Sequence, residues 1–147
     1  VAVLGLAGCG DDDDGGGGTA PPVAQTPSQA CDALAGRSIG SATISATALV
    51  AATGTVPEYC RVTGRIDPRL NFEVRLPSNW NGKLHYGGGG GFNGSVPAAN
   101  ANALSKGYAQ VSSDSGHQAG GTDASWALND QEALLNFAYL SVPAVTS

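Results

Sequence analysis

The sequence contains few positive charges, and this shortage argues against one large class of partner. Its 147 residues include 7 Lys or Arg against 12 Asp or Glu, for a formal net charge of −5. Asp11 to Asp14 supply four of the acidic groups, so the rest of the chain is nearly neutral. Because no basic cluster is present to neutralise phosphates, the sequence predicts no nucleic-acid partner.

Metal-binding side chains are also scarce. The chain has two histidines, His85 and His117, and three cysteines, none of which form a Cys-x-x-Cys pair. Structural zinc sites usually combine four such ligands at short spacings. The sequence therefore predicts no metal site and no cofactor within this chain.

No hydrophobic run at the N-terminus is long enough to span a bilayer. Residues 1–9 form a short apolar stretch that ends in small residues, which is typical of the end of an export signal. Leu6-Ala7-Gly8-Cys9 resembles the bacterial lipoprotein cleavage box, in which Cys9 would carry a lipid. The alternative is an ordinary signal. We expect an exported protein, either secreted or periplasmic, or held at a membrane only through a lipid on Cys9.

The stretch after Cys9 has little to bury. Residues 10–30 contain Asp11 to Asp14, the glycines Gly15 to Gly18 and a Pro-Pro pair. Charged, glycine-rich and proline-containing segments behave as flexible linkers. We predict a tether over residues 10–30 and a folded domain over residues 31–147.

Two cysteines, Cys31 and Cys60, remain in the predicted domain and flank a β-rich segment. In an oxidising compartment they favour a disulfide, which would close a loop of about thirty residues and stabilise the fold by about 3 kcal/mol. Two buried free thiols are the alternative.

The order of patterns predicts an α/β fold. Strands are expected near residues 41–51, 59–66, 72–76, 84–86 and 108–111, with a helix over 98–106, a polar loop over 112–125 and helices after the capping-box spacing at Asn129 and after Ser141. Asn81-Gly82 suits a tight hairpin. The change from a β-meander to alternating strands and helices predicts a mostly parallel sheet with crossover helices.

The most informative stretch is a glycine run, Gly87 to Gly91, that directly follows the strand at 84–86. Such a loop presents bare N–H groups at a sheet edge, where they can stabilise a developing negative charge. Inert linkers are also glycine-rich, but predicted strands flank this run closely on both sides. No Gly-x-Ser-x-Gly elbow occurs in the chain, so we expect any nucleophile of such an enzyme to lie downstream.

Four blocks in order resemble the N-terminal part of the tannase and feruloyl esterase family. They are residues 56–64, 72–83, 88–94 and 107–118. The resemblance implies the incomplete N-terminal part of an α/β-hydrolase sheet. It also implies a serine esterase of hydroxybenzoic or hydroxycinnamic acids, whose triad lies downstream with a lid that can bind calcium. Cys31 and Cys60 match a family disulfide.

The same resemblance places one oxyanion donor in this chain, a backbone N–H of Gly89, Gly90 or Gly91. Phe92 and Asn93 would either shape the acyl pocket or pin the loop. His85 and the tryptophans Trp80 and Trp126 are interpreted as packing residues.

Residues 113–117 contain Ser, Asp and His, the three residue types of a catalytic triad. Five consecutive residues rarely reach triad geometry, because its members must converge from separate strand ends. We therefore predict that Asp114 and His117 hydrogen-bond to each other and support a turn beside the site. The alternative to an esterase is a non-catalytic surface lipoprotein, a binding module that retains the fold.

Overall fold

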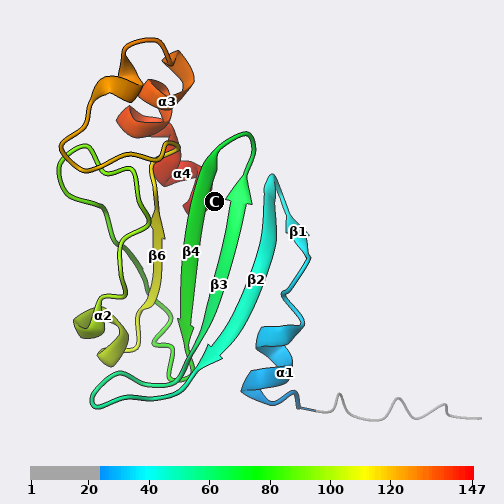
Figure 1. Ribbon diagram of the computed structural model, residues 1–147. Helices are drawn as coiled ribbons and strands as arrows, with labels where there is room; N and C mark the ends of the chain where they lie inside the picture. The colour runs from blue at the N-terminus through cyan, green and yellow to red at the C-terminus, as the bar shows by residue number, and fades with distance from the viewer. Residues whose placement is uncertain (1–23) are drawn as a thin grey trace, which may run out of the picture.

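The computed structural model describes residues 24–147 (Figure 1). Cys9, the predicted signal remnant and the first part of the predicted tether lie outside the described residues. Among residues 24–147, no helix combines the length and apolarity that crossing a membrane requires.

The core of the molecule is one six-stranded sheet with the spatial order β1-β2-β3-β4-β6-β5. The strands are β1 (Ser38–Ile39), β2 (Ala42–Val50), β3 (Tyr59–Ile66), β4 (Leu70–Pro77), β5 (Leu84–Tyr86) and β6 (Ala109–Ser113). Only β5 and β6 pair in parallel, and all other neighbours are antiparallel. The predicted mostly parallel sheet is therefore wrong for these residues, although the α/β class holds.

The position of β6 explains that difference. It lies between β4 and β5, so these two strands, which are consecutive in the chain, do not pair with each other. Asn81-Gly82 consequently forms no hairpin. Instead the Asn81 N–H donates to Gly107 O at 2.8 Å and its side-chain amide donates to Lys106 O at 2.7 Å.

Short helices stand at both ends of the sheet (Figure 1). They are α1 (Pro27–Asp32), α2 (Ala101–Ser105), a 3-10 turn (Ser125–Ala127), α3 (Gln131–Leu135), a π-helical turn (Asn136–Leu140) and α4 (Ser141–Thr146). Thr26 begins α1 with a capping box that it forms with Gln29. Helical structure therefore extends into residues 27–30, inside the predicted tether range.

Two predicted helix boundaries also differ from the structure. The side chain of Asp130, not Asn129, caps α3 by accepting from the N–H of Ala133. The π-helical turn ends at Leu140 and leads directly into α4, which begins at Ser141 as predicted. Near the other end of the sheet, Asn100 caps α2, so that helix starts later than residue 98.

One face of the sheet carries the hydrophobic core. Buried side chains of β2, β3 and β4 meet α1 there, and the disulfide between Cys31 and Cys60 joins α1 to β3. Phe72 lies across Gly64 of the neighbouring strand, where a Cβ would come within 2.4 Å of the ring. Phe72 and Val74 of β4 share this core face, in the two-residue period of a strand.

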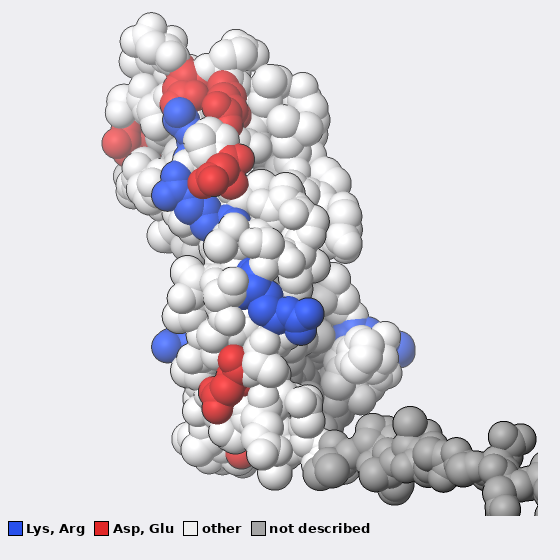
Figure 2. Space-filling view, turned by 90° about the vertical axis from the view of Figure 1, so that its right-hand side faces the viewer, with Lys and Arg blue, Asp and Glu red and all other residues white. Residues whose placement is uncertain are grey.

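The other face of β4 is polar but not fully solvated. Arg75 is only 4% exposed, and it pairs with Glu73 at 2.6 Å and donates to Pro97 O at 3.0 Å. The segment before α2 therefore covers part of this face. Figure 2, which views the β1 side of the molecule, shows Lys and Arg interspersed with acidic residues rather than gathered in one patch.

Candidate active site

The glycine run and the segment after β6 meet at one edge of the sheet. Because β5 and β6 are parallel, their carboxyl ends lie at the same edge, with Tyr86 opposite Val111. The N–H of Gly87 continues the ladder by donating to Val111 O at 2.8 Å. Ligands of open α/β sheets bind beyond such carboxyl ends.

The glycine loop, residues 88–91, presents unused donors. Among residues 24–147, the N–H groups of Gly88, Gly89, Gly90 and Gly91 donate no hydrogen bond. A Cβ at Gly89 would meet the side chain of Asn93 at 1.8 Å, and one at Gly91, where φ is +59°, would meet Gly121 O at 2.1 Å. A Cβ at Gly90 would meet nothing within 4 Å. A side chain at position 89 or 91 would therefore clash with neighbouring groups, whereas one at position 90 would not.

Three hydrogen bonds hold the chain that follows the glycine loop. The N–H of Phe92 donates to Gly121 O at 2.8 Å, and its carbonyl lies 2.9 Å from the Nε2 of His117. The N–H of Ala119 donates to Gly94 O at 3.1 Å. The side chain of Phe92 remains 42% exposed, so its backbone is anchored while its ring stays available to a ligand.

Asn93 is 7% exposed and has a φ of 50°. Its Nδ2 donates to Ser113 O at 3.0 Å and to Ser115 Oγ at 2.8 Å. Ser115 also has a positive φ, of 62°. These are the two non-glycine residues with positive φ in the described chain, and such strained positions cluster at functional sites.

Asp114 is 2% exposed and organises the opposite loop. Its carboxylate accepts from the backbone N–H and the side chain of Asn71, from the N–H of Gly116 at 2.9 Å and from the side chain of Gln118. The prediction that Asp114 bonds to His117 is wrong, because four other donors already surround this carboxylate.

His117 serves the glycine loop instead. A carbonyl oxygen can only accept, so the Nε2 of His117 carries the hydrogen that binds Phe92 O. The imidazole stacks on Trp126 with ring centroids 3.6 Å apart, and Phe137 packs against both rings. Trp126 is thus a packing residue, as predicted. Trp80 is not, because it is 61% exposed and its indole N–H donates to Lys83 O.

The serines of residues 113–117 do not form a triad with His117. The Oγ of Ser113 lies 3.0 Å from the Tyr86 hydroxyl and accepts from the N–H of Ser115. The Oγ of Ser115 accepts from Asn93. Since His117 is engaged with Phe92, no imidazole in this cluster is placed to deprotonate a serine.

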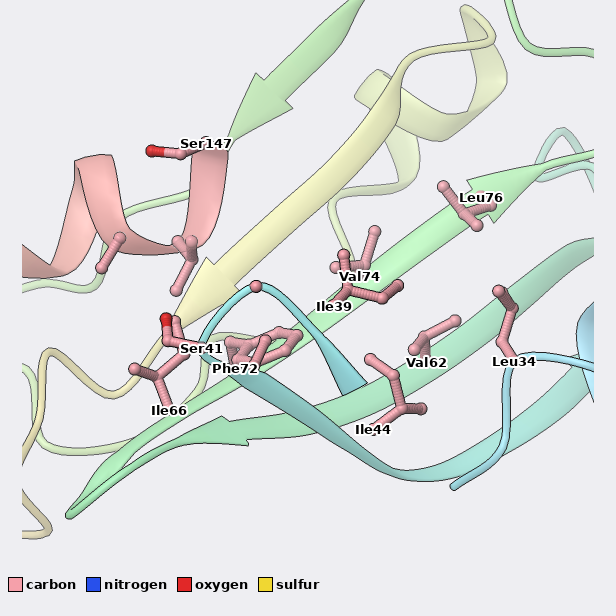
Figure 3. Close-up of a pocket in the computed structure, with 14 residues that line it drawn as sticks. Leu34, Ile39, Ser41, Ile44, Val62, Ile66, Phe72, Val74, Leu76 and Ser147 are labelled. Carbon is pink, nitrogen blue, oxygen red and sulfur yellow. The ribbon is translucent and has the colours of Figure 1, made fainter. Parts of the chain in front are cut away.

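An apolar groove of about 390 Å³ lies elsewhere, on the core face of the sheet (Figure 3). Side chains of β2, β3 and β4, among them Ile44, Val62 and Phe72, point into it together with Leu34 and residues of α4. Its lining contains no titratable side chain. The groove therefore offers no acid–base chemistry, and the polar sheet edge at the glycine loop is the better candidate site.

Two carboxyl groups with lowered pKa values, those of Asp123 and Asp130, lie beside this sheet edge rather than in it. The Ala133 N–H, which donates to the Asp130 carboxylate, lowers the pKa of Asp130, and Arg69 in the β3–β4 turn adds an ion pair. Hydrogen bonds from Ser125 lower the pKa of Asp123. Asp130 caps α3, and Asp123 accepts from the N–H of Ser125, the first residue of the 3-10 turn that carries Trp126.

Several residues of this site carry no sequence signal. Ser113 and Gly121 contribute backbone carbonyls, which every residue possesses, and Trp126 reaches His117 across an irregular loop. Tyr86 could have been found, because it ends the strand before the glycines. The sequence-predicted Gly89, Gly90, Gly91, Phe92, Asn93, Asp114 and His117 all lie in these two segments, whereas Cys31 and Cys60 lie in the core.

Comparison with known proteins now adds to this geometry. The family model described as tannase and feruloyl esterase matches residues 51–147. An uncharacterized esterase of Agrobacterium fabrum is 44% identical over 105 residues, which cover 60% of this chain and 19% of that protein. A mono(2-hydroxyethyl) terephthalate hydrolase of Piscinibacter sakaiensis is 34% identical over 119 residues, which cover 65% of this chain and 20% of that protein. The chain thus spans about a fifth of the length of these curated relatives.

Solved structures share the fold. The crystal structure of an esterase from Aspergillus oryzae superposes with a TM-score of 0.70 at 20% sequence identity. The match covers 81% of this chain and 28% of that structure.

Proposed function

The chain belongs to the tannase and feruloyl esterase family, and from this premise we propose that it forms the oxyanion-binding, N-terminal part of a longer serine esterase. The observation that carries the proposal is the row of unused N–H groups from Gly88 to Gly91 at the carboxyl edge of the sheet. The small share of each relative that the chain spans supports a longer whole protein.

In the proposed reaction, a serine supplied by the rest of the protein attacks the ester carbonyl. The carbonyl oxygen becomes an oxyanion, and at least one N–H among Gly89, Gly90 and Gly91 donates to it. Such preorganised donors act mainly in the transition state, so they raise kcat more than they lower KM. Phe92, with its exposed ring beside these donors, is proposed to contact the acyl group.

The proposed substrates are esters of aromatic carboxylic acids of the hydroxybenzoic, hydroxycinnamic or terephthalic type. Support comes from the family description and from the relative that is named as a terephthalate monoester hydrolase. Methyl ferulate, methyl gallate and mono(2-hydroxyethyl) terephthalate should be hydrolysed by the full-length protein with a higher kcat/KM than methyl butyrate. Equal values for the aliphatic ester would contradict aromatic specificity.

Three alanine variants of the full-length enzyme test the oxyanion role. Gly91→Ala and Gly89→Ala should each lower kcat by about a hundredfold, because a Cβ there forces the loop to move away from its neighbours. Gly90→Ala should have the smallest effect of the three, because its Cβ would enter open space and its N–H is retained. If all three variants fold and keep the parental kcat, the loop is only a structural turn.

The 147-residue chain alone should show no ester hydrolysis above background, because the described segments contain no triad. Turnover by this chain that disappears in Ser113→Ala would contradict the proposal. A folded full-length protein that binds these esters without turning them over would favour the binding-module alternative.

We also propose that the protein is exported and anchored through a lipid on Cys9. The Leu6-Ala7-Gly8-Cys9 run supports this, as does the Cys31–Cys60 disulfide, because disulfides persist in oxidising compartments. Cys9→Ser should release the protein from the membrane fraction and abolish palmitate labelling. Unchanged fractionation and labelling would leave an ordinary export signal.

A further inference from the structure

The side chain of Asn93 lies underneath the glycine loop, between that loop and the end of β6. We propose that Asn93 is the positioning residue that holds the N–H groups of residues 88–91 in the geometry needed for catalysis, an inference that rests on the proposed esterase function. Asn93 would not touch the substrate. It would act through the backbone that it supports.

Asn93 contacts the glycine loop at two points. Its own N–H donates to Gly90 O at 3.0 Å, which closes a tight turn. Its Oδ1 lies so close to Gly89 that a Cβ at that glycine would be 1.8 Å from it. The loop therefore folds over the Asn93 side chain, and only a residue without a Cβ fits at position 89.

The same side chain is tied to the sheet. The two hydrogens of Nδ2 go to Ser113 O, at the end of β6, and to Ser115 Oγ. Both acceptors are buried. The side-chain amide of Asn93 thus contacts both Gly89 in the loop and the end of β6.

Few other residues could make all of these contacts. The position requires a φ of 50°, which asparagine tolerates better than most residues, and two donors on one short side chain. Aspartate has the same shape but accepts only. Glycine allows the backbone conformation but lacks the amide.

Among residues 24–147, no other group holds residues 88–91 by a hydrogen bond. On one side the last ladder bond is made by Gly87, and on the other the anchors from His117 and Gly121 act on Phe92. Within the described part of the chain, the one hydrogen bond that involves residues 88–91 is the bond from Asn93 to Gly90. Glycines have the largest backbone freedom of all residues, so four in a row need such a support to present fixed donors.

The test uses the full-length protein with Asn93→Gly, Asn93→Asp and Asn81→Gly. Asn81 is the matched control, because its amide also donates to a backbone carbonyl, that of Lys106, near the opposite end of β5. We expect Asn93→Gly to lower kcat about tenfold or more, with KM changed by less than about threefold. Asn93→Asp should lower kcat further, because it removes both donors and adds a negative charge beside the oxyanion. Asn81→Gly should keep the parental kcat.

The crystallographic B-factors of residues 88–91, relative to the mean of each structure, provide a second readout. They should rise in Asn93→Gly and remain unchanged in Asn81→Gly. If an Asn93 variant does not fold, Ser115→Ala, which removes one of the two acceptors, should show the same changes at smaller size. Parental kcat and unchanged B-factors of residues 88–91 in the folded variants overturn the proposal.

The two readouts also separate this inference from the proposed function. A wild-type protein that hydrolyses no ester would refute the esterase, and the B-factors of residues 88–91 would still decide whether Asn93 orders the loop. An active wild type whose Asn93 variants match the Asn81 control would refute only the positioning role.

Discussion

The two halves of this molecule are held together in different ways. The β2–β4 half is stabilised by apolar contacts, a disulfide and long antiparallel ladders, with residues such as Val62 and Phe72 at its centre. The carboxyl edge of β5 and β6 is held by hydrogen bonds that the side chains of Asn93, Asp114 and His117 make, many of them with backbone atoms.

This difference predicts different responses to substitution. Apolar contacts are non-directional, so a core substitution should change stability in proportion to the volume it removes. Hydrogen bonds at the loop edge are directional, so a substitution there should change the position of a backbone donor and affect turnover more than stability. The core therefore mainly determines the free energy of unfolding, and the loop edge mainly determines the positions of the backbone donors.

The largest effect should come from the centre of the core. Phe72→Ala should lower the free energy of unfolding by about 3 to 5 kcal/mol, because it opens a cavity above Gly64. Gly64→Ala should destabilise the parent, where its Cβ would clash with the Phe72 ring, but much less in the Phe72→Ala background. Chemical denaturation of the four proteins in this cycle measures the coupling. Strictly additive changes would contradict the contact.

The disulfide should contribute the next largest effect. Removing the Cys31–Cys60 bond should cost about 3 kcal/mol, because the bond joins residues 29 apart in sequence. Reduced parent and a Cys31→Ala, Cys60→Ala double variant form a useful pair, since both lack the bond but only the second loses the sulfur atoms from the core. If peptide mapping of exported protein finds both thiols free, the core lacks this bond.

At the loop edge, His117→Phe should affect turnover more than stability, unlike the core substitutions. The ring can still stack on Trp126, but the carbonyl of Phe92 loses its donor. We expect a loss of about 1 to 3 kcal/mol in unfolding free energy from the unsatisfied carbonyl. The fall in kcat should exceed any rise in KM. Trp126→Phe, which keeps every hydrogen bond of the loop, should leave kcat close to parental, and equal losses in both variants would argue for packing alone.

The smallest effect should be the pH dependence contributed by Asp130. Its pKa is lowered in the folded protein chiefly by the N–H of Ala133. This stabilisation is present above the pKa of the unfolded state and is lost as pH falls through the lowered pKa of the folded state. The Tm advantage of the parent over Asp130→Asn should therefore shrink on acidification. A constant difference across the titration would contradict the assigned cap.

The local features of this protein follow from its sequence. The alternation of Phe72 and Val74 with Glu73 and Arg75 predicts β4, because a two-residue period is a property of each strand alone. The glycine run after β5 also predicts the loop locally, because glycine has no side chain and its backbone is exposed whatever the fold. The resemblance to a known family also follows from short, ordered blocks.

Only the tertiary structure decided which strands are neighbours. The insertion of β6 between β4 and β5 depends on long-range pairing that leaves no period in the sequence, so a mostly parallel sheet and a hairpin at Asn81-Gly82 were predicted in error. The partners of Asp114 and His117 were missed because their contacts, Asn71 and the carbonyl of Phe92, lie far away in the chain. Because residues 88–91 are all glycine, the sequence determined that no side chain covers their N–H groups. The fold determined the direction of these groups, through the contacts of Asn93 with the loop and with the end of β6.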